Sequence, residues 1–356
     1  MTLCIVFIRP ALALSFLASL STAWLSTIHS DWISTLHQPV RLGHGQLYSV
    51  GGKDEMSTKA RPSFALYAPF AEYAWERLRG LNHEDGTPMF LDSEVVPDNF
   101  LHKSAPSGGP SSPNTSIEIK VQGLQSMSDE NRIISYARYA LLETTQPENQ
   151  SSILPGIQVL NLVLFPNKSY ELPIFGADLV SLPGNKHLVA IDFQPLRTEG
   201  LILPISFQKR LEETHNKYKH LFPWGGDIPP QAKRFFSPYA LWTRIGSYPK
   251  SKETGEAAST VVADTHEAAV QVIQTHVQQA FKDYLDLYLD LVVASRFNTC
   301  EKTTSQLEQG HVAYLDYRRT NDPARPLLKR LYGEEWSEAL IETVLFPESG
   351  PYTKYC

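Results

Sequence analysis

The chain has 356 residues and a formal net charge of −6, with 42% hydrophobic and 11% aromatic residues. This length and composition suit one large domain or two ordinary ones with a substantial core, and the negative charge argues against bulk nucleic-acid binding. The cysteines, Cys4, Cys300 and Cys356, show neither metal-ligand spacing nor an even-numbered disulfide framework, and no glycine-rich loop indicates a nucleotide or a flavin.

The first 60 residues differ in character from the rest. Residues 1–30 contain one arginine and no acidic residue, and their apolar run over 11–25 is shorter than the ~20 residues that span a bilayer. We therefore predict a targeting presequence and flexible segment over 1–60, followed by a single domain over 61–356. The expected destination is the plastid (the chloroplast stroma), and a simple secretory signal is the alternative.

Apolar periodicity predicts the following elements in chain order. A helix is expected over 70–81, and strands are expected over 116–121, 159–165, 172–180 and 187–193. Hairpin-sized turns join the last three strands, so the sheet should be mainly antiparallel. The pattern then becomes helical, over 206–221, 258–297 and two segments within 306–345 that 320–323 separates. Strands followed by helices indicate an α+β fold with helices on the sheet faces.

The long helix over 258–297 carries an acidic stripe formed by Asp283, Asp286 and Asp290. A metal or diphosphate site is one interpretation of this stripe. A solvated helix face is the favoured one, because charged faces are ordinary on amphipathic helices.

Asp178 stands in the apolar run 172–180, which predicts a buried strand. Burial disfavours a charged carboxylate and should raise its pKa, and a protonated acid in a dry pocket suits a proton-donating enzyme. The neighbouring strands carry Asn161, His187 and Asp192 among apolar residues, as the floor of a pocket would. The alternative for Asp178 is a structural role at a neighbouring loop. His187 and Asp192 are expected to be structural or to support the pocket from behind.

Seven segments together resemble the ferredoxin-dependent bilin reductases, over roughly residues 65 to 347. They are VLNLVLFP (159–166), ELPIFGADLV (171–180), IDFQPL (191–196), FPWGG (222–226), FFSP (235–238), DYRRTNDPARP (316–326) and YGEEW (332–336). The resemblance implies a three-layer α/β/α sandwich with a central, mainly antiparallel sheet. It also implies an open-chain tetrapyrrole between this sheet and the C-terminal helices. Reduced ferredoxin would supply single electrons, with no bound cofactor.

The resemblance also assigns roles to single residues. Asp178 matches a strand aspartate that donates a proton, and Asp322 matches an aspartate on the C-terminal loop. Asn161 stands where the biliverdin-to-phycocyanobilin branch has a histidine, and Glu143 lies near that branch's helper glutamate. The structural alternative for Asp322 is a turn or helix-start residue whose side chain accepts hydrogen bonds from backbone N–H groups. Asn161 is expected to form a hydrogen bond to a pyrrole or lactam of the substrate. The alternative is that it only satisfies the hydrogen-bonding needs of a neighbouring residue.

Asparagine at 161 with aspartates at 178 and 322 is most similar to the branch that reduces the A-ring diene of 15,16-dihydrobiliverdin to phycoerythrobilin. One alternative is the branch that acts on the C15 bridge of biliverdin, and another is a non-catalytic bilin carrier. The bilin propionates need cationic or amide partners. The candidates for these partners are Arg318, the first choice, with Arg325, Arg234 and Lys233. Asn321 and His187 are further candidates for substrate binding.

Ferredoxins are acidic, so this acidic chain should present a local basic patch to its electron donor. Residues that could form the patch are Lys209, Arg210, Lys217, Lys219, Lys233, Arg234, Lys329 and Arg330. The preceding bilin reductase is a candidate partner for substrate transfer. We expect a monomer that neither inserts stably into a membrane nor binds nucleic acid.

Overall fold

A computed structural model describes residues 64–82, 86–93, 102–104, 116–126, 133–145, 156–226, 228, 230–246, 260–261, 263–295, 304–322 and 324–346. All of them belong to the second of two units into which the chain divides, Pro62–Cys356. The predicted presequence lies outside the described residues, so that assignment and plastid import stay predictions. Among the described helices, none is long and apolar enough to cross a membrane.

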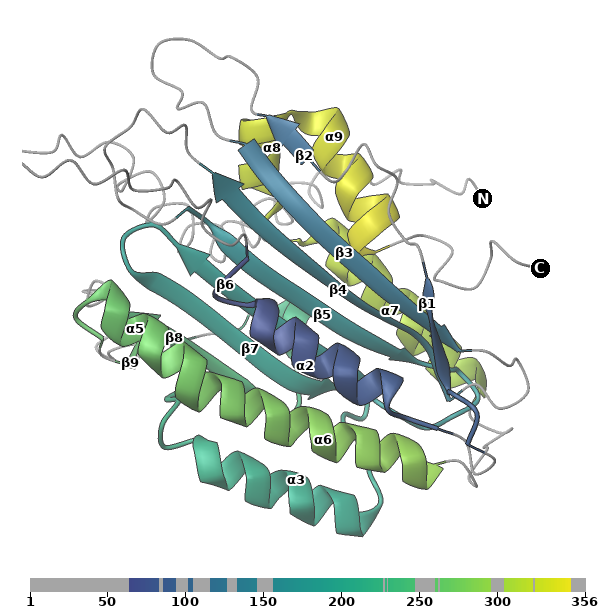
Figure 1. The fold of residues 1–356 in the computed structure, drawn as a ribbon. Helices are drawn as coiled ribbons and strands as arrows, with labels where there is room; N and C mark the ends of the chain where they lie inside the picture. The colour runs from purple at the N-terminus through teal and green to yellow at the C-terminus, as the bar shows by residue number, and fades with distance from the viewer. Residues whose placement is uncertain are drawn as a thin grey trace, which may run out of the picture. The chain divides into compact units, whose positions relative to one another are not determined.

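A nine-stranded sheet forms the centre of this unit (Figure 1). Its main path runs β1-β3-β4-β5-β6-β7-β8-β9, and β2 pairs with the outer edge of β3. Neighbouring strands are antiparallel except for β8 and β9, which are parallel. The strands are β1 (Phe90–Ser93), β2 (His102–Ser104), β3 (Ser116–Ser126), β4 (Ile134–Thr145), β5 (Gln158–Pro166), β6 (Ile174–Leu182), β7 (Lys186–Gln194), β8 (Leu241–Gly246) and β9 (Thr260–Val261).

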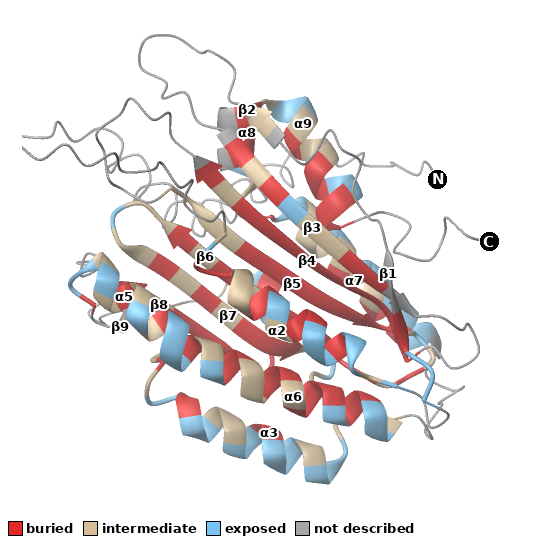
Figure 2. Ribbon diagram, viewed as in Figure 1, coloured by how far each residue is buried: buried red, intermediate tan, exposed pale blue. Residues whose placement is uncertain are grey.

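The helices α2 (Ala68–Arg79), α3 (Ile205–Tyr218), α5 (His266–Val272) and α6 (Gln278–Ala294) lie on one side of the sheet (Figure 1). A π-helical segment, η2 (Ile273–Val277), joins α5 to α6. Alternate strand residues such as Leu160 and Leu162 pack there with Phe281 of α6 in the largest apolar core. Figure 2 shows the burial on the helix faces that meet the sheet and the exposure on the outer faces.

The acidic stripe of α6 forms ion pairs with the neighbouring helices. Asp286 pairs with Arg77 of α2, Asp283 with Lys217 of α3, and Asp290 with Arg210 of α3. These are partly exposed pairs of the kind that contribute little individually. The favoured interpretation of a solvated, charged helix face is therefore confirmed, and the stripe lies on the outside of the fold.

The opposite side of the sheet is covered by α7 (Thr304–Thr320), α8 (Arg325–Tyr332), α9 (Glu334–Ala339) and the π-helical segment η5 (Leu340–Leu345). The predicted break at 320–323 separates α7 from α8. Helix α7 comes very close to the loop after β7, because a Cβ at Gly310 would stand 2.1 Å from the backbone oxygen of Leu196. Only glycine permits this approach without a shift of the helix.

Strands in the middle and helices on both faces confirm the predicted α+β, α/β/α sandwich. The small α4 (Pro230–Lys233) lies between α3 and β8 in the chain. Some predicted boundaries differ from the observed ones. Strand β3 continues to Ser126, and the predicted helix over 258–297 starts only at His266. Its N-cap is Thr265, whose side chain accepts from the Ala268 N–H at 3.1 Å and so fixes the first turn.

Candidate active site

The candidate site lies on the α7 face of the sheet, between two separate apolar clusters. One cluster contains Ala140 and Leu142 of β4, and the other contains Tyr136 of β4 and Val163 of β5. Because side chains on one face recur at every second residue, the position between the clusters on β4 belongs to Arg138. A band of polar side chains therefore crosses an otherwise apolar face.

Strand register places the two predicted strand residues side by side. Asn161 of β5 pairs directly with Asp178 of β6, so both side chains project from the same face. Their partners further along this row are Ala140 of β4 and Ala190 of β7. Small side chains on both sides leave the amide and the carboxylate as the prominent groups of the row.

The next row contains Arg138, Val163, Gly176 and Asp192 in register. The Arg138 guanidinium is completely buried, and its Nη2 donates to Oδ1 of Asn161 at 2.7 Å. Asp192, also buried, accepts from the backbone N–H and the hydroxyl of Ser237 at 2.8 and 2.5 Å. Burial raises the pKa of Asp192 to about 7, against the lowering effect of these hydrogen bonds. This geometry agrees with the predicted structural role, since Asp192 anchors the segment before β8.

Helix α7 forms the roof of the site. Leu307, Tyr314 and Arg318 follow one another at intervals of seven and four residues and so share one helix face. Arg318 Nη2 donates to Oδ2 of Asp178 at 2.9 Å, which joins the roof to the floor. Burial alone would lower the pKa of the Arg318 guanidinium, but interactions with Tyr314, Asp178 and Asp322 outweigh it and raise the pKa. Arg318 is thus a firmly charged group among acidic and phenolic neighbours.

One expectation about the acids needs correction. Asp178 is not a buried, isolated carboxylate, because its side chain is 29% exposed and forms an ion pair with Arg318. Asp322 is the buried acid of the pair, with a residue exposure of 8%. Burial is the largest effect on the pKa of Asp322 and raises it, and the charge of Asp178 acts in the same direction. The nearby Arg318 and the hydrogen bond from the Ala324 N–H lower this pKa. The expectation of an isolated carboxylate at Asp178 failed because its partner, Arg318, comes from α7. The pattern of a strand contains no information about the helix that packs above it.

Asp322 also has the structural role that was its alternative. Its Oδ1 accepts from the Ala324 N–H at 2.8 Å, at the connection between α7 and α8. The capping bond holds the carboxyl group at the end of α7, close enough to Arg318 and Asp178 for their charges to act on the pKa of Asp322. The structure thus brings together Asn161, Asp178, Arg318 and Asp322.

His187 and Glu143 lie on the opposite face of the sheet from Asp178 and are not part of this group of residues, which for His187 agrees with the structural role expected of it. His187 is completely buried, and its Nδ1 lies 2.7 Å from the Ser181 hydroxyl. That hydroxyl lies 2.7 Å from the hydroxyl of Tyr67, just before α2. Glu143 accepts from the backbone N–H of Phe64 at 2.5 Å. Both side chains point towards the α2 face of the sheet, because the odd-numbered residues of β4 and β7 project to that side.

The remaining candidates lie near the site or outside it. Arg325 forms an ion pair with Glu338 and donates to the Arg319 carbonyl, so its guanidinium is already bound. Asn321 is exposed and donates to the Tyr317 carbonyl at 3.1 Å. Arg234 lies over the ring of Phe235, 4.3 Å from its centroid, at a separate surface pocket.

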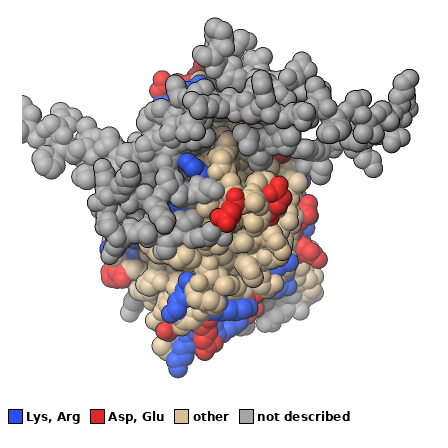
Figure 3. All heavy atoms as spheres, turned by 90° about the vertical axis from the view of Figure 1, so that its left-hand side faces the viewer, with Lys and Arg blue, Asp and Glu red and all other residues tan. Residues whose placement is uncertain are grey.

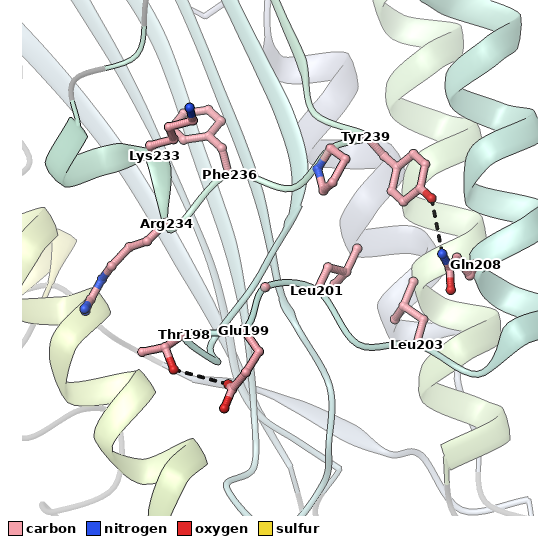
Figure 4. Close-up of a pocket in the computed structure, with 11 residues that line it drawn as sticks. Thr198, Glu199, Leu201, Leu203, Gln208, Lys233, Arg234, Phe236 and Tyr239 are labelled. Carbon is pink, nitrogen blue, oxygen red and sulfur yellow. Dashed lines mark hydrogen bonds between the residues drawn. The ribbon is translucent and has the colours of Figure 1, made fainter.

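That surface pocket has a volume of about 310 Å³ and is lined by Lys233, Arg234, Glu199, Gln208 and Tyr239, among others. Figure 4 shows Lys233 and Arg234 on the α4 side of the pocket and Gln208 on α3, with its amide 3.5 Å from the Tyr239 hydroxyl. The pocket is distinct from the band of polar residues on the sheet, so Arg234 is not part of that constellation.

The comparisons with known proteins agree with this geometry. A family model described as "Ferredoxin-dependent bilin reductase" matches residues 152–347. The chain is 35% identical over 280 residues to a phycoerythrobilin:ferredoxin oxidoreductase from Synechococcus sp. strain WH8020, covering 79% of this chain and 92% of that protein. It is 33% identical over 286 residues to the enzyme of that name from Nostoc punctiforme, covering 80% and 94%. The chain belongs to the ferredoxin-dependent bilin reductases.

The crystal structure of tomato phytochromobilin synthase in complex with biliverdin has the same fold as this bilin reductase. The TM-score is 0.54 at 23% sequence identity, covering 79% of this chain and 82% of the tomato protein. The family makes the chain an oxidoreductase. Among the residues that the structure describes, no group of three or more His, Cys, Asp or Glu side chains is placed to hold a metal ion.

Arg138 is the site residue that sequence reasoning missed in this bilin reductase. It precedes the residues that the family model matches, and it stands in the run ISYARYALL (134–142), where the other residues are apolar, aromatic or small. A lone arginine in the middle of a buried strand is as anomalous as Asp178 and would have been a usable signal.

The buried His187 gives the bilin reductase a testable dependence of stability on pH. Burial, with a smaller contribution from the nearby His266, lowers the pKa of His187 to about 4. The folded state therefore binds fewer protons at this residue than the unfolded state between about pH 6.5 and pH 4. Stability from the neutral imidazole is present above pH 6.5 and is lost as the pH falls towards 4.

We expect the free energy of unfolding of the wild type, relative to His187→Gln, to fall by about 3 kcal/mol between pH 7 and pH 4. Chemical denaturation of both proteins across this range measures the difference. His220→Gln is the control, because His220 is exposed after α3. A difference between wild type and His187→Gln that stays constant with pH would contradict a neutral, buried His187.

Proposed function

We propose that the protein reduces the A-ring diene of 15,16-dihydrobiliverdin to phycoerythrobilin, with reduced ferredoxin as the electron donor and no resident cofactor. The observation that best supports this proposal is the cross-strand pair of Asn161 and Asp178, with Arg318 above it and Asp322 beside it. The relatives named phycoerythrobilin:ferredoxin oxidoreductase support the same step.

The proposed reaction adds two electrons and two protons to the bilin. Ferredoxin delivers the electrons one at a time, so a bilin radical forms between the two transfers. Asp178 and Asp322 are the proton donors, because both carboxyl groups reach one part of the site from different elements. Asp322 suits this role since burial raises its pKa and favours the protonated acid. Asn161 has no acidic proton and binds the substrate by hydrogen bonds instead.

Arg318 links substrate binding to these acids. Its side chain is 18% exposed, and its guanidinium forms the ion pair with Asp178 within the site. A bilin propionate would compete with Asp178 for the same N–H groups, since arginine binds carboxylates well through its planar fork. An arriving substrate would thereby release Asp178 from its ion pair and leave the carboxyl group free to exchange a proton.

Ferredoxin would dock at Lys233 and Arg234. Neither residue forms an ion pair with another described residue, and Phe235 beside them packs against Tyr314 and Tyr317 of the roof helix. Some other members of the predicted patch are already paired or lie on another face. Lys217 and Arg210 pair with acids of α6, and positive and negative side chains are mixed in the lower part of Figure 3. Lys329 and Arg330 belong to α8, across the sheet from α3.

We expect Lys233→Glu/Arg234→Glu to raise the KM for ferredoxin about tenfold or more at low salt, because two attractive charges become repulsive. The dissociation constant for the bilin should stay unchanged, and added salt should narrow the difference from wild type. Steady-state assays with varied ferredoxin measure this. Lys120→Glu, on the exposed side of β3, is the charge-matched control. An equal effect of both variants would exclude docking at α4.

An anaerobic assay with reduced ferredoxin tests the reaction itself. The protein is incubated separately with biliverdin and with 15,16-dihydrobiliverdin, and absorbance spectra and chromatography identify the products. Phycoerythrobilin from dihydrobiliverdin alone is the expected result. Dihydrobiliverdin formed from biliverdin would assign the protein to the C15-reducing branch. Tight binding without reduction of either pigment would indicate a carrier.

A further inference from the structure

Arg138 is an unusual group because its charge is buried without a matching partner. The side chain has no exposed surface, and its one hydrogen bond joins Nη2 to the neutral amide oxygen of Asn161. Its Nε and Nη1 are buried and have no hydrogen-bond partner among the described residues. Burying a guanidinium with unsatisfied donors is costly, and such groups in native proteins call for an explanation.

Among the described residues, no carboxylate accepts a hydrogen bond from Arg138. Asp178 is the acid close enough to stabilise its charge, but that carboxylate is hydrogen-bonded to Arg318. Arg318 itself repels Arg138, and the phenol groups of Tyr136 and Tyr314 are the other titratable neighbours. The pocket therefore contains two arginines and two carboxyl groups, Asp178 and Asp322, but neither carboxyl group accepts a hydrogen bond from Arg138. An additional anionic or carbonyl oxygen would satisfy the free N–H groups of Arg138.

One side chain covers both arginines. The ring of Phe346, which follows η5, has its centroid 5.8 Å from Cζ of Arg138 and 5.0 Å from Cζ of Arg318. Its backbone oxygen accepts from Nε of Arg319 at 2.6 Å. A flat conjugated ring thus rests on two guanidinium groups, which is a favourable cation–π arrangement. A pyrrole ring of an open-chain tetrapyrrole could form the same contacts.

We propose that Arg138 is a substrate-binding residue whose Nε and Nη1 donate to a lactam or propionate oxygen of the bilin, and that the bilin takes the place of the Phe346 ring. The proposal rests on the proposed bilin reduction and adds a binding residue to it. Arg138 then receives the acceptors it lacks in the substrate-free protein. Its burial beneath Phe346 is the substrate-free arrangement.

Arg138→Met and Arg138→Lys test this proposal by two measurements on the whole chain. Absorbance titrations with 15,16-dihydrobiliverdin and with biliverdin give the dissociation constants, and thermal unfolding without pigment gives Tm. We expect Arg138→Met to bind the pigments about 10- to 100-fold more weakly, as the loss of charge-assisted hydrogen bonds predicts. Its Tm should equal or exceed that of the wild type, because methionine removes an unsatisfied buried charge. Arg138→Lys should bind with intermediate affinity.

Arg197→Met is the matched control, for which we expect the opposite changes in Tm and in pigment affinity. Arg197 is largely buried but pairs with Glu171 at 2.7 Å, away from the polar band. Its loss should lower Tm and leave pigment affinity unchanged. Affinities of both Arg138 variants within twofold of the wild type would overturn the proposal. Loss of the folded state in both variants would also overturn it, since Arg138 would then be required for the fold. A wild type that binds neither pigment would contradict the proposed function instead.

Discussion

Asp178→Asn is expected to lower the rate of bilin reduction by about 100- to 10,000-fold, the usual contribution of a positioned acid. The substitution keeps the size of the side chain and its place opposite Asn161 on β5, but it removes the exchangeable acidic proton. Because the amide can still accept from Arg318, the roof helix should keep its contact with the floor. The pigment should therefore still bind with an affinity close to that of the wild type.

Single-turnover measurements with reduced ferredoxin under anaerobic conditions give the rate, and absorbance titration gives the affinity. Accumulation of a bilin radical in the variant would show that electron transfer continues without the proton. Asp290→Asn is the control, since it removes an aspartate–arginine ion pair on the outer side of α6. Full turnover by Asp178→Asn would remove Asp178 from the reaction.

Arg318→Gln is expected to weaken bilin binding about 10- to 100-fold, because glutamine retains hydrogen bonding but loses the charge and the fork. A second effect concerns the acids. Arg318 lowers the pKa of Asp322, so its removal should raise that pKa further. If Asp322 acts as a proton donor, its protonated form then persists to higher pH. The alkaline fall in turnover should move to higher pH in the variant.

The pH dependence of the rate at saturating pigment separates the two effects. A higher dissociation constant with an unshifted alkaline limb would restrict Arg318 to substrate binding. An unchanged dissociation constant would exclude its proposed contact with a propionate. Arg319→Gln is the neighbouring control, because Arg319 donates from Nε to the Phe346 carbonyl and pairs with Asp316 at 3.6 Å. Its loss should leave the alkaline limb in place.

The two acids differ in the way that their elements hold them. Asp178 is fixed by a strand and is accessible from the site, whereas Asp322 is fixed by a capping bond at the end of a helix and is buried. A strand position is rigid, and the connection between two helices can adjust more readily. We therefore expect substrate binding to move Asp322 and Phe346 more than Asp178 and Asn161.

The sequence by itself determined the fold class and the floor of the site. Apolar runs along β5, β6 and β7, with short turns between them, specify antiparallel neighbours, and this brings Asn161 and Asp178 onto adjacent strands. The family motifs over 159–196 and 316–336 likewise identified Arg318 and Asp322, because these residues stand in a contiguous run.

Only the tertiary structure decided which of these residues meet and which acid is buried. The face on which a strand residue projects depends on register, and this separates His187 of β7 and Glu143 of β4 from Asp178 of β6, although these strands lie close together in the sheet. The burial of Asp322 and the ion pair of Asp178 depend on where α7 lies above the sheet. The unpartnered charge of Arg138 likewise appears only when both layers are assembled, because long-range packing determines which donors find acceptors.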